Sequence, residues 1–101
     1  MTIEDHYAWE KLHAAVLILA TGTGSLRERL VDAYVSSLIR LRSDRHFPSP
    51  DLRQSFEDLM QEMAPDGNVR VALSAWPEGD LKRIAEGIVG LSDRVTRKAA
   101  G

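Results

Sequence analysis

The segment PDLRQSFEDLMQEM, residues 50–63, has the clearest helical periodicity in the chain and is the main indication of its fold class. Its apolar side chains step by 4, 3 and 4 residues, and a helix of about 3.6 residues per turn places such positions on one face. These residues are Leu52, Phe56, Leu59 and Met63. Ser49 can cap the helix, and Pro50 suits its first position, where the N–H that proline lacks would have no partner. The segment therefore predicts an amphipathic helix with one face in a core.

Two helices are predicted N-terminal to this segment, over about 4–20 and 25–43. Residues 21–24, Thr-Gly-Thr-Gly, separate them, and a glycine there is expected to end the first helix in the left-handed conformation. Ser25 and Glu28 have the spacing of a capping box, in which each side chain accepts a backbone N–H of the other residue. The second helix therefore begins at a well-defined point.

A last helix of about twenty residues is predicted after Pro77. Its apolar stripe consists of Leu81, Ile84, Ile88, Leu91 and Val95. Gly87 and Gly90 within it are expected to let a neighbouring helix approach closely. Residues 69–73, Val-Arg-Val-Ala-Leu, alternate between apolar and other side chains over part of their length, and we expect them to form a short extended segment.

Four helices with short connections in 101 residues predict a single all-α domain, a small four-helix bundle with antiparallel neighbours. The first two helices carry apolar residues on more faces than one small core can cover. We therefore expect a homodimer, because a second copy is the simplest source of a matching surface. The candidate interface residues are Ile18, Val35, Ile39 and Trp76, the last because tryptophan is enriched where partners bind.

The composition excludes several kinds of chemistry. Without cysteine the chain has no disulfide, no thiolate zinc site and no cysteine nucleophile. A net charge of −2 gives no overall attraction to nucleic acid or acidic lipid, which argues against nucleic acid as the partner. The longest apolar run, residues 14–20, is too short to span a bilayer, and acidic residues precede it where a secretory signal would be basic. We therefore expect a cytoplasmic protein that binds no membrane.

His6, Glu10 and His13 share one side of the first predicted helix, where two imidazoles and a carboxylate could ligate a metal. The spacing Glu10-x-x-His13 resembles the ligand pair of the ferritin-like di-iron bundles. That resemblance implies an iron site that is completed by a second copy and by further inward-facing glutamates. A solvated rim at the edge of the core explains the same residues without a metal, and we expect no cofactor.

Basic residues on the second predicted helix and just beyond it suggest an anion-binding or nucleic-acid-binding site, with Arg29, Arg40, Arg42 and Arg45 as candidates. Arg40 and His46 have an Arg-x5-His spacing that resembles the motif of the HEPN ribonucleases, which are helical bundles and often dimers. The resemblance implies phosphate binding by the arginine and proton transfer by the histidine. The attraction of cations to a helix C-terminus accounts for most of these residues without any ligand.

The function that these patterns favour is binding rather than catalysis. We expect a protein–protein interaction or self-association module, because no phosphate-binding loop and no nucleophile–base pair stands out, whereas apolar helix surface is in excess. Two alternatives stay open: a nucleic-acid-binding regulator that uses the arginines, and a metal-binding, di-iron-like enzyme that uses the histidines.

Overall fold

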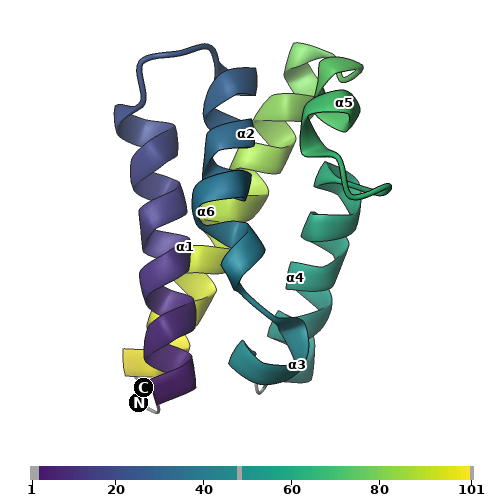
Figure 1. The fold of residues 1–101 in the computed structure, drawn as a ribbon. Coiled ribbons are helices and arrows are strands. Elements are labelled where there is room, and N and C mark those ends of the chain that lie inside the picture. Colours follow the sequence, from purple (N-terminus) through teal and green to yellow (C-terminus); the bar gives the residue numbers. More distant parts are fainter. Residues whose placement is uncertain (1–2, 48, 101) are drawn as a thin grey trace.

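The computed structural model describes residues 3–47 and 49–100, and every regular element in these ranges is helical (Figure 1). The elements are α1 (Ile3–Thr21), α2 (Leu26–Ser36), the 3₁₀ helix η1 (Leu38–Arg40), α3 (Ser43–His46), α4 (Pro50–Met63), α5 (Val69–Ser74) and α6 (Glu78–Ala100). The all-α prediction is confirmed. The radius of gyration, 12.8 Å, is close to the roughly 13 Å expected of a compact chain of 100 residues.

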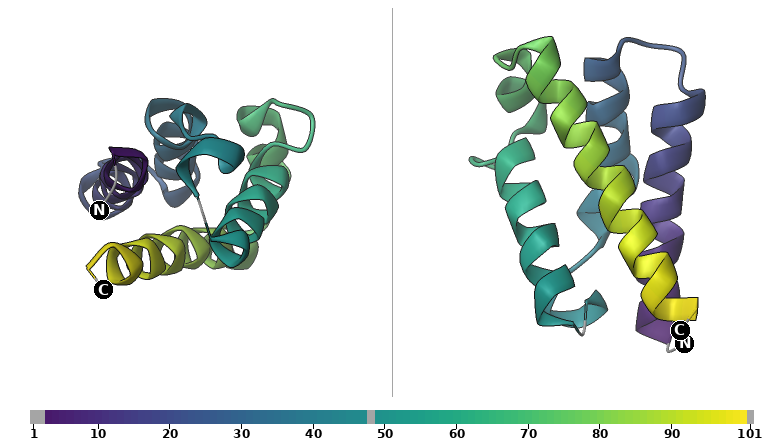
Figure 2. Two further views of the ribbon diagram at one scale, coloured as in Figure 1. Left: turned by 90° about the horizontal axis from the view of Figure 1, so that it is seen from below. Right: turned by 180° about the vertical axis from the view of Figure 1, so that it is seen from behind.

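The long C-terminal helix α6 organises the molecule by packing against α1, α2 and α4. It runs diagonally across the other helices and antiparallel to α1, so the two chain ends lie at the same end of the fold (Figure 2). In Figure 1, α2 lies between α1 on one side and α4 and α5 on the other. Within the described ranges, no helix combines the length and the apolarity that crossing a bilayer requires.

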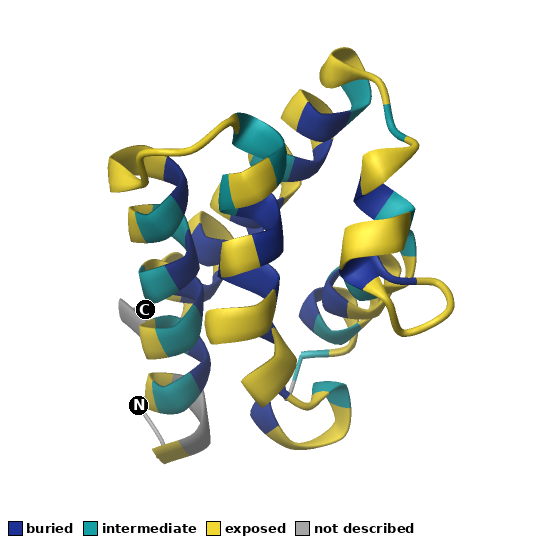
Figure 3. Cartoon of the chain, turned by 45° about the horizontal axis from the view of Figure 1, so that its top comes forward, coloured by how far each residue is buried: buried dark blue, intermediate teal, exposed yellow. Residues whose placement is uncertain are grey.

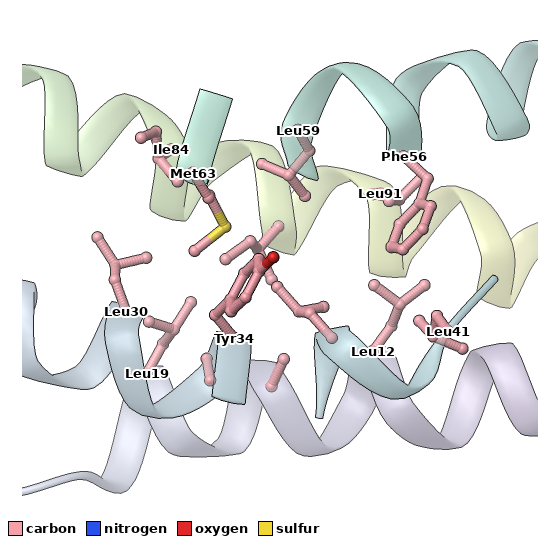
Figure 4. Packing of buried hydrophobic residues seen from close by; sticks show 14 of the residues in the cluster. Leu12, Leu19, Leu30, Tyr34, Leu41, Phe56, Leu59, Met63, Ile84 and Leu91 are labelled. Carbon is pink, nitrogen blue, oxygen red and sulfur yellow. The ribbon is translucent and has the colours of Figure 1, made fainter. Parts of the chain in front are cut away.

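The core forms where the apolar stripes of these helices meet (Figure 3). Both stripes that the periodicity predicts, on α4 and on α6, are buried along their whole length. Figure 4 shows Leu12 and Leu19 of α1, Leu30 of α2 and Ile84 of α6 pointing into the same interior. Phe56 stacks on Phe47, with 4.6 Å between the ring centroids, and this contact closes the end of the core beside α3.

The second predicted helix is wrong in length, because α2 ends at Ser36 and the chain to residue 46 is divided between η1 and α3. Ser36 and Ser37 favour this break, since serine has a lower helix propensity than alanine or leucine. Arg53 of α4 holds the irregular segment, because its Nε donates to the carbonyls of Ser43 and Phe47. A contact from the following helix α4 thus stabilises the irregular path that the chain takes after the break.

The predicted extended segment 69–73 is also wrong, because Val69–Ser74 forms the short helix α5. The Asn68 side chain accepts a hydrogen bond from the N–H of Val71 at 3.2 Å, which caps the helix. Val69 and Leu73, four residues apart, are buried, whereas Val71 is 66% exposed. The burial therefore follows the helical period, and the apparent alternation has no strand beside it to pair with.

The turn between α1 and α2 is held by side chains rather than by left-handed glycines. Gly22 and Gly24 both have negative φ, and Gly67 is the glycine with positive φ among the described residues, at 80°. An added Cβ at Gly22 would lie 2.6 Å from the Ile18 carbonyl oxygen and 2.8 Å from Cγ of Arg29, so close packing requires glycine there. The predicted capping box of Ser25 and Glu28 is confirmed.

Two smaller expectations about caps and glycines are corrected by the structure. The Ser49 side chain makes no capping hydrogen bond, although Pro50 does begin α4. Gly87 and Gly90 do not mediate close helix packing within the chain, since an added Cβ would lie 3.6 Å from Leu59 at the first position and would meet nothing within 4 Å at the second. Both glycines face outward, and the core of α6 is built without them.

Candidate functional site

An apolar groove between α1 and α6 is the candidate functional site. The two helices pack together near the chain ends and separate toward the other end of the molecule (Figure 2, right). The open part has a volume of about 690 Å³. Its apolar lining consists of Val16, Leu19 and Ala20 from α1, Leu26 from α2, and Ala85, Val89 and Gly90 from α6. A surface hollow with such a lining suits another apolar side chain better than it suits water.

Charged residues of both signs line the α6 side of the groove: Lys82 near one end, Glu86 in the middle and Asp93 near the other end. Lys82 and Glu86 make no ion pair with any described residue. Asp93 pairs with Arg97 at 3.0 Å, one turn further along the exposed side of the helix. The groove therefore offers an apolar floor with a cation and a carboxylate about 16 Å apart along α6, at about 1.5 Å per residue.

The four interface residues expected from the sequence lie elsewhere and have different surroundings. Val35 and Ile39 are 43% and 56% exposed on α2 and η1, whereas Ile18 and Trp76 are partly buried against the core. The carbonyl of Trp76 accepts a hydrogen bond from Arg27, and the Arg83 guanidinium lies 5.6 Å from the tryptophan ring centroid. Among these four, Val35 and Ile39 are thus the residues that present apolar surface to solvent, and none of the four lines the groove.

The four candidate arginines divide into one structural residue and a cluster of three. Arg29 donates to the carbonyls of Leu19 and Gly24, and so it holds the C-terminal end of α1. Arg40, Arg42 and Arg45 line a separate hollow of about 360 Å³. Ile3, Tyr7 and His46 complete its wall. The structure therefore brings together three of the four side chains that the sequence analysis singled out for anion binding.

Arg40 and His46, the two residues of the Arg-x5-His spacing, line this same hollow. The Nε of Arg40 donates to the Ser36 carbonyl at 3.2 Å. His46 is buried, its Nδ1 accepts the backbone N–H of Arg42 at 2.9 Å, and its ring lies 4.8 Å from that of Tyr7. Both side chains thus have structural contacts within the chain.

The three residues considered for a metal are arranged around Trp9 rather than around one point. The His6 and His13 rings stack on the Trp9 ring, with centroid distances of 5.8 and 5.1 Å. Glu10 lies 4.0 Å from His6 and 3.4 Å from Lys11, and both contacts are on the surface. No group of three His, Asp or Glu side chains suited to a metal ion occurs among the residues that the structure describes.

Comparison with known proteins gives no family to which the chain can be assigned. No protein-family model, curated protein or solved structure matches it.

The groove is the feature that the sequence did not reveal. The sequence feature that could have indicated the groove is the pair Ala85 and Val89, which are four residues apart on α6 and lie outside the buried stripe of that helix. An apolar pair at that spacing predicts a second contact surface on the helix. Its partner surface on α1, however, could not be known before the helices were placed.

Proposed function

We propose that this chain is a protein–protein interaction module that self-associates, with a second copy of α6 bound in the groove between α1 and α6. The main support is the apolar groove, which lies open to solvent beside the buried core. Val89, at its centre, is 47% exposed although it lies among apolar neighbours. Burying such surface against a second copy is favourable by roughly 25 cal/mol per Å² of apolar area.

The pattern of residues on α6 favours a second copy over another occupant. A two-fold axis makes each residue meet a fixed counterpart, so an interface of this kind must be complementary to itself. The groove residues of α6 are symmetric about the point midway between Gly87 and Ile88: residues 82 and 93, 85 and 90, and 86 and 89 are equidistant from it. Two antiparallel copies of α6 crossing there would place each Lys82 opposite the partner's Asp93.

The same register brings small residues together. Ala85 of one copy would face the partner's Gly90. Because alanine carries only a methyl group and glycine only a hydrogen atom, the two helix axes could approach closely there. Glu86 would lie beside the partner's Val89, with its carboxylate free to reach solvent at the rim. The charges at both ends and the small residues between them therefore support one antiparallel arrangement.

Sedimentation of the purified chain over a wide concentration range tests the proposal. We expect a monomer–dimer equilibrium that Val89→Glu abolishes, because the carboxylate would be buried in the apolar groove. Ile39→Glu is the matched control, since Ile39 is at least as exposed but lies outside the groove. A monomer at every concentration would contradict self-association. If Ile39→Glu abolishes the dimer and Val89→Glu does not, the interface lies on α2 and η1 instead of in the groove.

A charge exchange tests the antiparallel register. Lys82→Glu or Asp93→Lys alone should weaken the dimer, because each places like charges opposite one another in both halves of a symmetric interface. The double variant should restore it, since the attraction is then re-formed with the signs reversed. The pair of Asp93 with Arg97 is surface-exposed and contributes little, so its loss does not explain a large effect. If the two substitutions together weaken the dimer by the sum of their separate effects, this register is ruled out.

A further inference from the structure

The arginine hollow, the second concave site, is formed by segments that come together at one end of the fold. Arg40 lies at the end of η1, Arg42 precedes α3 and Arg45 lies within it. Ile3 and Tyr7 of α1 provide the opposite wall, and His46 lies among them. The hollow lies on a different set of residues from the α1–α6 groove, so its role does not depend on self-association.

The guanidinium groups in the hollow make few interactions within the chain. Arg40 donates to one backbone carbonyl, and Arg42 lies 3.5 Å from Asp44 in a pair of which both side chains are mostly exposed. Arg45 makes no hydrogen bond or ion pair with any described residue. Exposed ion pairs of the Arg42–Asp44 kind contribute little to stability, so a bound anion would displace little.

The remaining arginines show how unusual this is within the molecule. Of the ten arginines in the chain, five make hydrogen bonds or ion pairs that join separate elements: Arg27, Arg29, Arg53, Arg83 and Arg94. Among the described residues, Arg97 pairs with Asp93 on its own helix, and Arg70, like Arg45, makes no such contact. Three of the five weakly engaged arginines therefore gather at one hollow.

The hollow is held in shape before any ligand arrives. The bond from the Arg42 N–H to Nδ1 of His46 fixes the backbone across α3, and Arg53 holds the same turn through the Ser43 carbonyl. The Tyr7 ring packs on the His46 ring, which anchors α3 to α1. Because the backbone that carries the three arginines is already fixed, binding would cost conformational entropy mainly in their side chains.

From these observations we propose that the arginine hollow binds the terminal phosphate group of a small molecule. Three guanidinium groups on one hollow match the several oxygens and the double charge of a phosphate monoester better than a single carboxylate, which one arginine can satisfy. Ile3 and the Tyr7 ring offer apolar wall to an attached organic group. A nucleic-acid chain would need a continuous basic track, whereas most other arginines are engaged and the net charge is −2.

Nuclear magnetic resonance titration of the full chain tests this site, with inorganic phosphate and phenyl phosphate as the two probes at constant ionic strength. We expect saturable shifts confined to Tyr7 and residues 40–46. Arg45→Gln should raise the dissociation constant about tenfold or more, because it removes a charge-assisted pair. Arg70→Gln is the matched control, since it removes the same charge from another arginine without contacts, and should leave affinity unchanged.

The two probes also identify the source of the phosphate. Tighter binding of phenyl phosphate assigns the site to a phosphorylated organic molecule, whereas equal or weaker binding assigns it to free phosphate. The proposal is overturned if neither probe gives saturable shifts in the hollow, or if Arg70→Gln weakens binding as much as Arg45→Gln. It is also overturned if a single-stranded oligonucleotide without a terminal phosphate binds the hollow more tightly than phenyl phosphate.

Discussion

At the scale of single residues, Gly22 and Gly87 differ in the space around them rather than in unusual backbone angles. Gly22 lies against the Ile18 carbonyl and the aliphatic part of Arg29, and this packing joins the end of α1 to the start of α2. Gly87, in contrast, lies on the outer side of α6 with room for a methyl group. The same residue type therefore has opposite consequences for stability at the two positions.

Gly22→Ala should lower the free energy of unfolding by about 1–3 kcal/mol, because the new methyl group forces the turn or the Arg29 side chain to move. Gly87→Ala should raise it by about 0.5–1 kcal/mol, since alanine loses less backbone entropy than glycine in a helix. Urea denaturation of both variants measures the two changes. Equal effects of the two substitutions would contradict the packing role of Gly22.

At the scale of elements, the short helix α5 shows how a cap and two buried side chains decide a segment of ambiguous pattern. Val69 and Leu73 reach the core together only if the segment is helical, and Asn68 provides the acceptor that the first turn lacks. Arg27 then donates to the Leu73 carbonyl at 3.0 Å, which ties the end of α5 to α2. The element is thus specified at both ends by side chains.

Asn68→Ala should reduce the free energy of unfolding by about 1 kcal/mol, because the N–H of Val71 loses its acceptor. Asn68→Asp should retain most of the stability, since a carboxylate oxygen can accept the same hydrogen bond. Thermal and urea denaturation followed by circular dichroism provide the measurement. If Asn68→Ala and Asn68→Asp change the free energy of unfolding by the same amount, the cap does not determine the stability of α5.

At the scale of the whole molecule, the groove links stability to concentration. A second copy binds only the folded chain, so dimer formation stabilises the folded state by mass action. The unfolding temperature of the wild-type chain should therefore rise with protein concentration. That of Val89→Glu should stay constant, because its groove no longer accepts a second copy. Scanning calorimetry at several protein concentrations measures both unfolding temperatures. A wild-type unfolding temperature that does not change with concentration would contradict the dimer.

Local pattern alone predicted much of the fold. The stripes of α4 and α6 identified their buried residues, and Ser25 with Glu28 identified the start of α2. These features depend on residues within a few positions of one another, so the sequence contains the information. The predicted C-terminal end of α2 and the predicted state of residues 69–73 were wrong, because the contacts of Arg53 with residues 43 and 47 and the core contacts of Val69 and Leu73 join separate elements.

Periodicity and spacing along the chain were enough to predict its helical character, the faces that enter the core and the arginines gathered after α2. The groove left where α1 and α6 separate, and the hollow that Tyr7 and Arg45 share, follow from how the helices pack. The physical reason is that periodicity is a property of one helix, whereas a groove or a hollow exists only once distant segments are packed side by side.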